Sequence, residues 1–318
     1  MSKISGKNFT PHFTYPAKRS SKKTNKKLLD SVDLIFTPAA SSCVAYLKTN
    51  KPIVYLSDTA FSLMVNYYYF NLSDFNIKEG NKIEQLTARN STHIIVSSDW
   101  AKKAYIEYYS VPEEKISVIE FGANIDGIEL VNNTDNKTNG PLNILFLGVE
   151  WKRKGGDVAV ECVRKLNESG INAHLYIVGT GTPKEYLKYD FIKPIGFLNK
   201  NKDSEYQQLR EIISKSDILL LPTRAECSAI AFSEASAYGL PIFTYDTGGI
   251  ANYVINGKNG YRLDLSANGD GFANRIKECI EKDELPLLKK GCENIYNSNL
   301  NWNVWTEKVR NIIDNCLR

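Results

Sequence analysis

The stretch that decides the fold runs from Arg224 to Val254 and reads RAECSAIAFSEASAYGLPIFTYDTGGIANYV. It follows ISKSDILLLPT (213–223), whose apolar run predicts a strand, and its own small residues predict a helix that begins near Ala229. Glu226 lies in the loop after the strand, and Glu234 lies eight residues later, inside the helix. Because ligands of open parallel sheets bind outside the carboxyl ends of the strands, we expect both carboxylates near one ligand.

The start of this helix is suited to a phosphate. The first backbone N–H groups of a helix have no partner within it, and the helix dipole adds positive potential there. Carboxylates beside such a phosphate are well placed to accept hydrogen bonds from sugar hydroxyls. A chain with 36 Asp and Glu contains many Glu pairs by chance, and most of those are solvated. The surrounding strand, loop and helix nevertheless favour a nucleotide-sugar site.

The chain continues with YGLPIFTYDTGGIANYVINGKNGYRL (238–263). With the two Glu residues, this segment resembles the donor-site signature of the retaining glycosyltransferases of family 4 (glycosyl transferases group 1). The matching residues are Glu226, Glu234-Ala235, Gly239-Leu240-Pro241, Gly248-Gly249 and Asn259-Gly260. The chain departs from the family at Cys227-Ser228-Ala229, where a glycine-rich triplet is usual. The resemblance implies an α/β protein of the GT-B type: two Rossmann-like doubly wound domains with a cleft between them.

A basic loop forms a second signature. Arg153 and Lys154 follow the strand predicted at Asn143 to Leu147, just before a Gly-Gly pair. A short Lys-Arg-Lys run is by itself more typical of a solvated turn, but two fixed cations would also stabilise the charge that develops on a departing diphosphate. The loop is similar to the family's Gly-Arg…Glu-Lys-Gly segment, and Lys154 falls on its Lys. Val149 replaces the family's Arg, so we expect Arg153 to supply that charge.

Three further candidates follow from the resemblance. Gly122 lies in a loop that the family places at the end of the first domain, facing the donor; simple turn chemistry is the alternative. Asp58 follows a strand where the family carries a His near the anomeric centre, and could accept a hydrogen bond from donor or acceptor. An Asp there equally often caps the next helix. Phe197 lies in the loop where the family holds the nucleotide base.

The resemblance also implies the reaction. It predicts a metal-independent, retaining enzyme that moves a hexose-type sugar from a nucleoside-diphosphate sugar to a glycan or lipid-linked acceptor, in polysaccharide or glycoconjugate synthesis. Glu226 would hold the hydroxyls of the transferred sugar and Glu234 those of the ribose. Arg153, Lys154 and the backbone from Ser228 through Ala229 to Ile230 would hold the diphosphate. No cofactor is expected, and no acidic pair in the sequence indicates a metal site.

The opening of the chain leaves alternatives open. Met1 to Lys27 is polar and basic, without the apolar strand and glycine-rich turn that open the family's first domain. We therefore expect a first domain that is incomplete at its start, and a partner subunit could complete it. One alternative function is a non-catalytic or partner-dependent member that binds nucleotide sugar or glycan. Another is a nucleotide-sugar 2-epimerase of the same fold, which the basic loop fits less well.

Composition predicts a soluble enzyme with two cored domains. The chain has 318 residues, of which 42% are hydrophobic and 24% charged. Its net charge of +4 is too small to indicate nucleic acid. The basic stretch Lys18–Lys27 either touches an anionic membrane or is a solvated helix start, and the solvated reading is favoured. Without a transmembrane-length apolar segment or a secretion signal, the expected location is cytoplasmic, with the inner membrane face as an alternative.

The order of predicted elements gives the domain limits. Apolar strands alternate with helical patterns throughout, which is typical of parallel doubly wound sheets. Residues 1–130 should form the acceptor-side domain, and residues 141–302 the donor domain. The polar stretch VNNTDNKTNG (131–140) reads as a linker, and a last helix at 303–318 is expected to pack on the first domain. The predicted strands are Leu34–Thr37, Ile53–Leu56, Ile94–Ser97, Ile116–Glu120, Ile144–Leu147, Ala173–Val178, Ile192–Ile195, Ile218–Leu221, Ile242–Thr244 and Gly260–Leu263.

Overall fold

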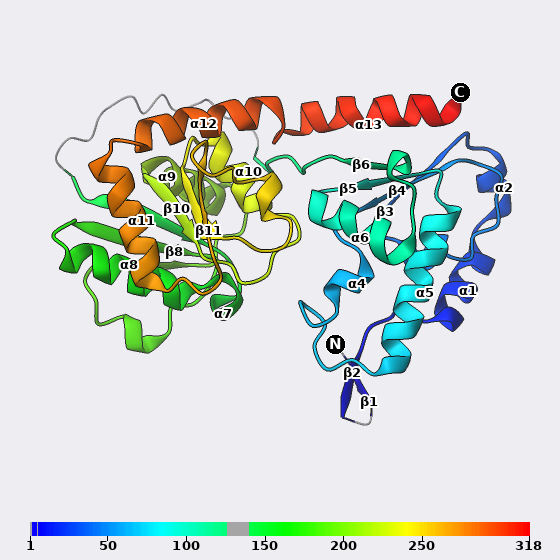
Figure 1. Ribbon diagram of the computed structural model, residues 1–318, viewed down its shortest axis with the longest axis horizontal. Helices are drawn as coiled ribbons and strands as arrows, with labels where there is room; N and C mark the ends of the chain where they lie inside the picture. The colour runs from blue at the N-terminus through cyan, green and yellow to red at the C-terminus, as the bar shows by residue number, and fades with distance from the viewer. Residues whose placement is uncertain (1, 5, 126–139) are drawn as a thin grey trace. The chain divides into compact units, whose positions relative to one another are not determined.

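The computed structural model describes residues 2–4, 6–125 and 140–318 (Figure 1). The chain divides into two compact units. The first contains Met1–Glu120 and Asn303–Arg318, and the second contains Phe121–Trp302. Most of the predicted linker lies outside the described residues. The unit boundary comes earlier in the chain than predicted, because the segment after Glu120 is hydrogen-bonded to the second unit: the Ala123 N–H donates to the Leu300 carbonyl at 3.0 Å.

The second unit is built on a six-stranded parallel sheet with the order β12-β11-β10-β7-β8-β9. Its strands are β7 (Leu142–Leu147), β8 (Ala173–Val178), β9 (Ile192–Gly196), β10 (Ile218–Leu221), β11 (Ile242–Tyr245) and β12 (Gly260–Leu263). Its helices are α7 (Trp151–Lys154), α8 (Gly156–Glu168), α9 (Asp203–Lys215), α10 (Ile230–Ala237), α11 (Gly269–Glu281) and α12 (Leu285–Ser298). All four residues of β10 are buried, as expected of a central strand covered on both faces.

The strand order of this sheet creates a topological switch point. The chain enters at β7, builds one side through β8 and β9, and then returns to build the other side from β10. β7 and β10 are direct neighbours, with Ile144 opposite Ile218 and Leu145 opposite Leu219. At such a point the loops after the two strands diverge and leave room for a ligand. The loop after β7 carries Arg153 and Lys154, and the loop after β10 carries Glu226.

The first unit contains a four-stranded parallel sheet with the order β3-β4-β5-β6, and a separate antiparallel hairpin. Its strands are β1 (Ser2–Ile4), β2 (Lys7–Phe9), β3 (Ile35–Pro38), β4 (Ile53–Ser57), β5 (His93–Val96) and β6 (Ile116–Val118). Its helices are α1 (Thr14–Lys23), α2 (Lys26–Asp30), α3 (Ser41–Val44), α4 (Phe61–Met64), α5 (Asp74–Asn90) and α6 (Asp99–Tyr109). The last helix, α13 (Trp302–Leu317), brings Trp305 edge-on to Phe36 of β3, with ring centroids 6.4 Å apart.

The predicted fold class is confirmed, since both units are parallel-sheet α/β domains. Each of the ten predicted strands is present, with ends that shift by a residue or two. The hairpin β1–β2 was not predicted, because its two short strands are largely polar and show no run of apolar residues. That the first domain lacks its opening stays a prediction.

Candidate functional site

The loops after β7 and β10 meet at Gly155. This residue ends α7 in the left-handed region, at φ 78°, and a Cβ there would collide with the Pro222 carbonyl oxygen just after β10. Only glycine combines this backbone conformation with so close an approach. The glycine therefore lets the short helix α7 lie directly against the loop that carries Glu226.

The contact brings Lys154 and Glu226 together. The Lys154 ammonium donates a hydrogen bond to Oε2 of Glu226, and the two side chains are only 12% and 11% exposed. The Glu226 backbone is held as well, because its carbonyl accepts the Gly249 N–H at 3.1 Å. A nearly buried ion pair thus lies at the switch point of the sheet.

Arg153 also approaches this carboxylate. Its Nη1 lies 3.8 Å from Oε2 of Glu226 and donates to the Ala225 carbonyl at 2.8 Å. Its Nε is paired with Glu150. The structure therefore brings together all three charged residues that the sequence predicted for the sugar and diphosphate. Two cations converge beside one carboxylate, which suits a ligand with both hydroxyls and negative phosphate.

The helix start expected to bind phosphate follows directly. Ala229 is the residue before α10, which begins at Ile230, one residue after the predicted start. Ala229 is buried, whereas Ser228 and Ile230 are partly exposed. The Ile230 N–H points back to the Ser228 carbonyl at 3.2 Å, in a tight turn. Their role toward a phosphate stays a prediction.

Glu234 is buried in α10 and is neutralised by a residue that sequence reasoning missed. Burial raises the pKa of its carboxyl; the Lys200 ammonium, which donates to Oε1, and a hydrogen bond with the Asn124 backbone both oppose this rise. Lys200 lies in the loop between β9 and α9 and is 39% exposed at its side chain. The only signal for it in the sequence was its position three residues after Phe197, in the loop expected to hold the base.

The other predicted residues have distinct surroundings. Phe197 follows β9 and is 67% exposed. Gly122 belongs to the second unit, whereas we had expected it in the first. A Cβ on Gly122 would lie 2.6 Å from the Trp302 backbone nitrogen, so packing alone requires glycine at this position.

Asp58 lies in the first unit, directly after β4, and is half-buried. Its carbonyl accepts the Ser97 hydroxyl at 3.1 Å. Asp58 is not the N-cap residue of α4, as the alternative required, because the residue before that helix is Ala60. A role for Asp58 toward donor or acceptor stays a prediction.

The downstream part of the signature is structural. The Asn259 side chain accepts the Ile255 N–H at 2.7 Å and donates to the Tyr253 carbonyl at 2.8 Å. A Cβ on Gly260 would collide with the Ile242 carbonyl oxygen of the neighbouring strand. The Asn-Gly pair therefore shapes the turn into β12, which leaves the charged residues after β7 and β10 as the part suited to a ligand.

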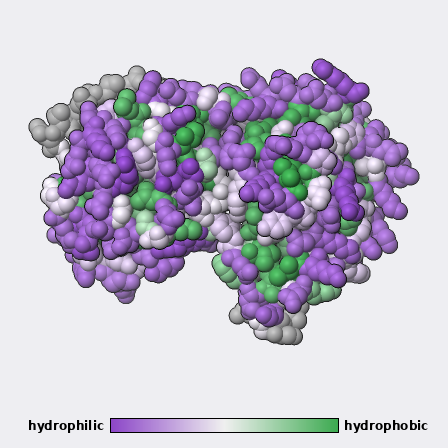
Figure 2. Space-filling model, in the orientation of Figure 1, coloured by the Kyte–Doolittle hydropathy of each residue, from purple (hydrophilic) through white to green (hydrophobic). Residues whose placement is uncertain are grey.

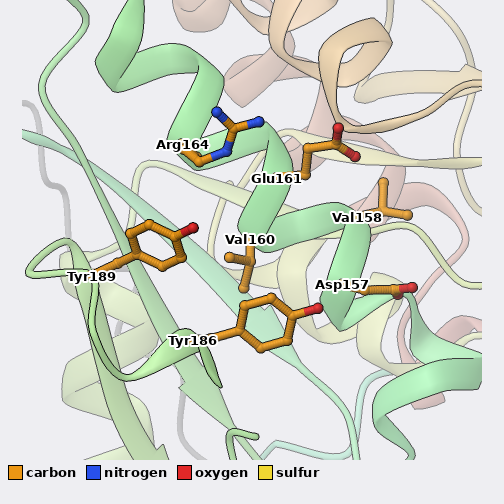
Figure 3. A pocket seen from close by; sticks show the side chains of 7 residues that line it. All are labelled: Asp157, Val158, Val160, Glu161, Arg164, Tyr186 and Tyr189. Atoms are coloured by element: carbon orange, nitrogen blue, oxygen red, sulfur yellow. The ribbon is translucent and has the colours of Figure 1, made fainter. Parts of the chain in front are cut away.

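A pocket of about 280 Å³ lies beside α8, next to this site (Figure 3). Its lining residues are Asp157, Val158, Val160, Glu161, Arg164, Tyr186 and Tyr189. Burial opposes ionisation of Asp157, but hydrogen bonds from Arg224 and Lys152 outweigh it and lower the pKa of this carboxyl. The pocket contains none of the predicted donor residues, and its acids are already engaged within the protein.

Within residues 2–4, 6–125 and 140–318, no three His, Cys, Asp or Glu side chains gather as metal ligands would. In the same part of the chain, no helix combines the length and apolar character needed to cross a bilayer.

Comparison with known proteins decides the family. The profile of the glycosyl transferases group 1 matches residues 130–297, more than half of the chain. The chain belongs to this family. The matched residues include β7, β10 and both predicted Glu residues.

Individual proteins similar to this chain also carry the name glycosyltransferase. The amylovoran biosynthesis glycosyltransferase AmsK of Erwinia amylovora is 26% identical over 203 residues, which are 59% of this chain and 47% of AmsK. A solved glycosyltransferase of Rickettsia africae superposes with a TM-score of 0.69 at 19% identity, covering 100% of this chain and 84% of that one. The Anabaena protein HepE, solved with UDP, gives 0.69 at 17% identity, over 91% and 81%. This chain spans about half the length of the curated relatives it matches.

Proposed function

We propose that this protein is a retaining glycosyltransferase of family 4, which transfers a hexose-type sugar from a nucleoside-diphosphate sugar without a metal ion. The observation that carries the proposal is the convergence of Lys154, Arg153 and Glu226 at the switch point of the second sheet. Two cations can stabilise a leaving diphosphate where many other enzymes use Mg²⁺. The carboxylate can accept hydrogen bonds from the sugar that the diphosphate carries.

Each residue of the site has a separate role in the proposed reaction. The bond between the anomeric carbon and the diphosphate oxygen breaks, and the electron pair stays on the diphosphate beside Lys154 and Arg153. The acceptor hydroxyl attacks from the face that the diphosphate leaves, forming the new glycosidic bond, and a diphosphate oxygen takes the hydroxyl proton. Glu226 orients the sugar through its hydroxyls, which is a positioning effect. Asp58 would take part from the first unit as a hydrogen-bond acceptor for donor or acceptor.

Donor binding has to open the ion pairs of Glu226 and Glu234. Lys154 would turn from Glu226 to the diphosphate, while sugar hydroxyls replace it on the carboxylate. Lys200 would leave Glu234 when ribose hydroxyls donate to that carboxylate. Each buried acid therefore keeps a partner throughout, which avoids the cost of an unpaired buried charge. Backbone groups from Ser228 to Ile230 would complete the diphosphate site.

The comparisons guide the choice of substrates. HepE was solved with UDP, so UDP-sugars are the first donors to test. AmsK is named for amylovoran biosynthesis, so a growing polysaccharide or its lipid-linked precursor is the acceptor that we propose. Membership of a glycosyltransferase family does not favour the binding-only alternative. A cytoplasmic location also belongs to the proposal.

The test combines donor binding and transfer. UDP-, GDP- and ADP-sugars are screened for thermal stabilisation of the purified protein, because a ligand of the native state must raise the melting temperature. The stabilising donor is then incubated with chelator and candidate acceptors, and the anomeric configuration of the product is read by NMR. Retention without metal is the expected result. An inverted product, or transfer that stops with chelator, would contradict the proposed mechanism.

Matched variants test the residues. In the Glu226→Gln and Lys154→Met variants, the donor should no longer raise the melting temperature, or sugar transfer should be lost. The exposed pair Lys277 and Glu281 on α11 provides Lys277→Met and Glu281→Gln as controls with the same chemical changes. If the site variants bind and transfer as well as the control variants, the assignment of the donor site is wrong.

A further inference from the structure

The first unit has a helix whose exposed face is basic and aromatic. Ala17 of α1 is fully buried against the unit, whereas Tyr15 on the opposite side is 74% exposed. Four exposed cations follow Tyr15 at intervals of three, four, seven and eight residues, which places them on the same face of the helix. They are Lys18, Arg19, Lys22 and Lys23.

A second aromatic residue lies at the beginning of this helix. Phe75, at the start of α5, is 66% exposed and stacks on Phe13 with ring centroids 6.0 Å apart. The Thr14 N–H donates to Glu79 of α5 at 2.8 Å, which fixes the two helices together. We call Tyr15, Phe75 and the four cations of α1 the basic-aromatic face. Figure 2 shows apolar residues gathered at the hairpin end of this unit, among hydrophilic ones.

Charge is distributed unevenly along the chain. Eight of the 40 Lys and Arg precede Asp30, where there is no Asp or Glu, so the rest of the chain has 32 cations against 36 carboxylates. In the described part of the chain, no cation of α1 forms an ion pair with a carboxylate. Lys18 instead lies over the Tyr46 ring, at 5.3 Å. Glu79 of α5 accepts the Thr14 N–H at the start of α1 and is paired with Lys82, and Asp74 at the start of α5 is exposed.

We propose that the basic-aromatic face docks on a membrane surface rich in anionic lipid. Aromatic rings of this kind settle at the level of the headgroups, and each Lys or Arg near the surface adds attraction to anionic lipids. Neither contribution alone holds a protein firmly. Here Tyr15 and the four cations share one face of α1, and Phe75 lies on α5, which is hydrogen-bonded to the start of α1. Charge complementarity decides the occupant: the cations of this face meet no carboxylates of their own, while the remainder of the chain is net negative.

Vesicle sedimentation tests the docking with the full chain and without any donor sugar. The protein should bind phosphatidylglycerol–phosphatidylcholine vesicles, bind phosphatidylcholine vesicles weakly, and be released by salt. The double variant Lys22→Glu/Lys23→Glu should bind the anionic vesicles at least about tenfold more weakly. Tyr15→Ser/Phe75→Ser should weaken binding while leaving the salt dependence in place, because it removes only the apolar contribution.

The second unit offers matched controls. Lys258→Glu/Lys282→Glu makes the same charge change at exposed lysines, and Leu287→Ser removes a side chain that is 74% exposed, like Tyr15. Both should bind vesicles as the unaltered protein does, and circular dichroism checks that every variant is folded. Equal binding to both kinds of vesicle, no binding at low salt, or equal losses in face and control variants would overturn the proposal. So would oligonucleotide binding that the face variants abolish while vesicle binding is unchanged.

The experiments distinguish a failure of the docking proposal from a failure of the proposed donor site. The face variants should keep the thermal stabilisation by donor, because the residues of the donor site belong to the second unit. Loss of vesicle binding with intact donor binding supports docking through this face. Loss of donor stabilisation in the folded face variants would contradict an independent docking surface.

Discussion

Lys154 and Glu226 form a nearly buried ion pair across two loops that follow neighbouring strands, β7 and β10. In the sequence the two residues are 72 positions apart. Removing one partner of such a pair leaves the other buried without compensation, which costs more than the pair itself contributes. Variants at this pair therefore affect both stability and activity, and the two effects have to be measured separately.

Lys154→Met should reduce the transfer rate by roughly 100-fold, because charge that develops on the leaving diphosphate loses a fixed cation. Single-turnover kinetics with saturating donor measures this loss at the chemical step. Lys152→Met, an exposed neighbour on the same short helix, should change the rate little. If both variants lose the same activity, the loss reflects the general charge of the loop and not Lys154.

Glu226→Gln should weaken donor binding by about 10- to 100-fold, because a charged acceptor of sugar hydroxyls is replaced by a neutral one. Calorimetric titration can compare the sugar nucleotide with the nucleoside diphosphate alone. The defect should appear with the sugar nucleotide and be much smaller with the diphosphate. An equal loss for both ligands would contradict the assignment of Glu226 to the sugar.

Lys200→Met should make stability more dependent on pH. Burial raises the pKa of Glu234, and without the Lys200 ammonium it should rise further. A carboxyl whose pKa is higher in the folded than in the unfolded protein binds its proton more tightly in the folded state. Its contribution to the free energy of unfolding is therefore present at low pH and is lost as pH rises through the pKa of the folded protein. Urea unfolding across a pH series measures this. Lys202→Met, an exposed lysine of the same loop paired with Glu205, is the control and should not steepen the dependence.

Glu84→Gln should remove a pH-dependent loss of stability in the first unit. Burial raises the pKa of Glu84 from 4.5 to about 7, although a hydrogen bond from Tyr105 lowers it in part. The unaltered protein should thus lose roughly 3 kcal/mol of stability as pH rises from about 4.5 through 7. In urea unfolding, the stability of the Glu84→Gln variant should depend less on pH than that of the unaltered protein. Glu107→Gln, at an exposed position of α6, is the control and should leave the pH dependence unchanged.

Gly155→Ala should destabilise the second unit by more than about 1 kcal/mol, since the residue is left-handed and its Cβ would collide with Pro222. Relief of the collision would move α7 away from the β10 loop and weaken donor binding. Gly181→Ala, where a Cβ meets open space, is the matched control and should be close to neutral. Urea unfolding and donor titration of both variants check this. A stable Gly155→Ala protein with normal donor affinity would show that the close contact is not needed.

Much of the fold could be predicted because buried parallel strands are continuous apolar runs. ILLL of β10 and AHLYIV of β8 read as strands from composition alone, and the observed bounds match the predicted ones. The hairpin β1–β2 has no such run, and hydrogen bonds to residues far along the chain, such as Asn8 N–H to Asn71, hold it. Long-range contacts of that kind leave no periodic signal in the sequence.

The distinction between local patterns and long-range contacts also explains which site residues could be predicted. Glu226, Lys154 and Arg153 could be selected because each follows a recognisable strand in a segment that resembles the family's signatures, and the strand order then brings them together. Lys200 could not be selected in this way, because its ion pair with Glu234 depends on the path of the loop after β9. Gly122 was assigned to the wrong unit, since its neighbours in space are Asn301 and Trp302, nearly two hundred residues away along the sequence.

The strand order has a consequence for the synthesis of this chain. β7 acquires β8 on one edge early, but its other edge stays unpaired until β10 emerges from the ribosome. During that interval an apolar strand edge is exposed, and such edges template aggregation. A chain cut before Ile218 would therefore be an aggregation-prone intermediate and not a smaller donor-binding domain, so any dissection of the second unit has to keep β7 through β12 together.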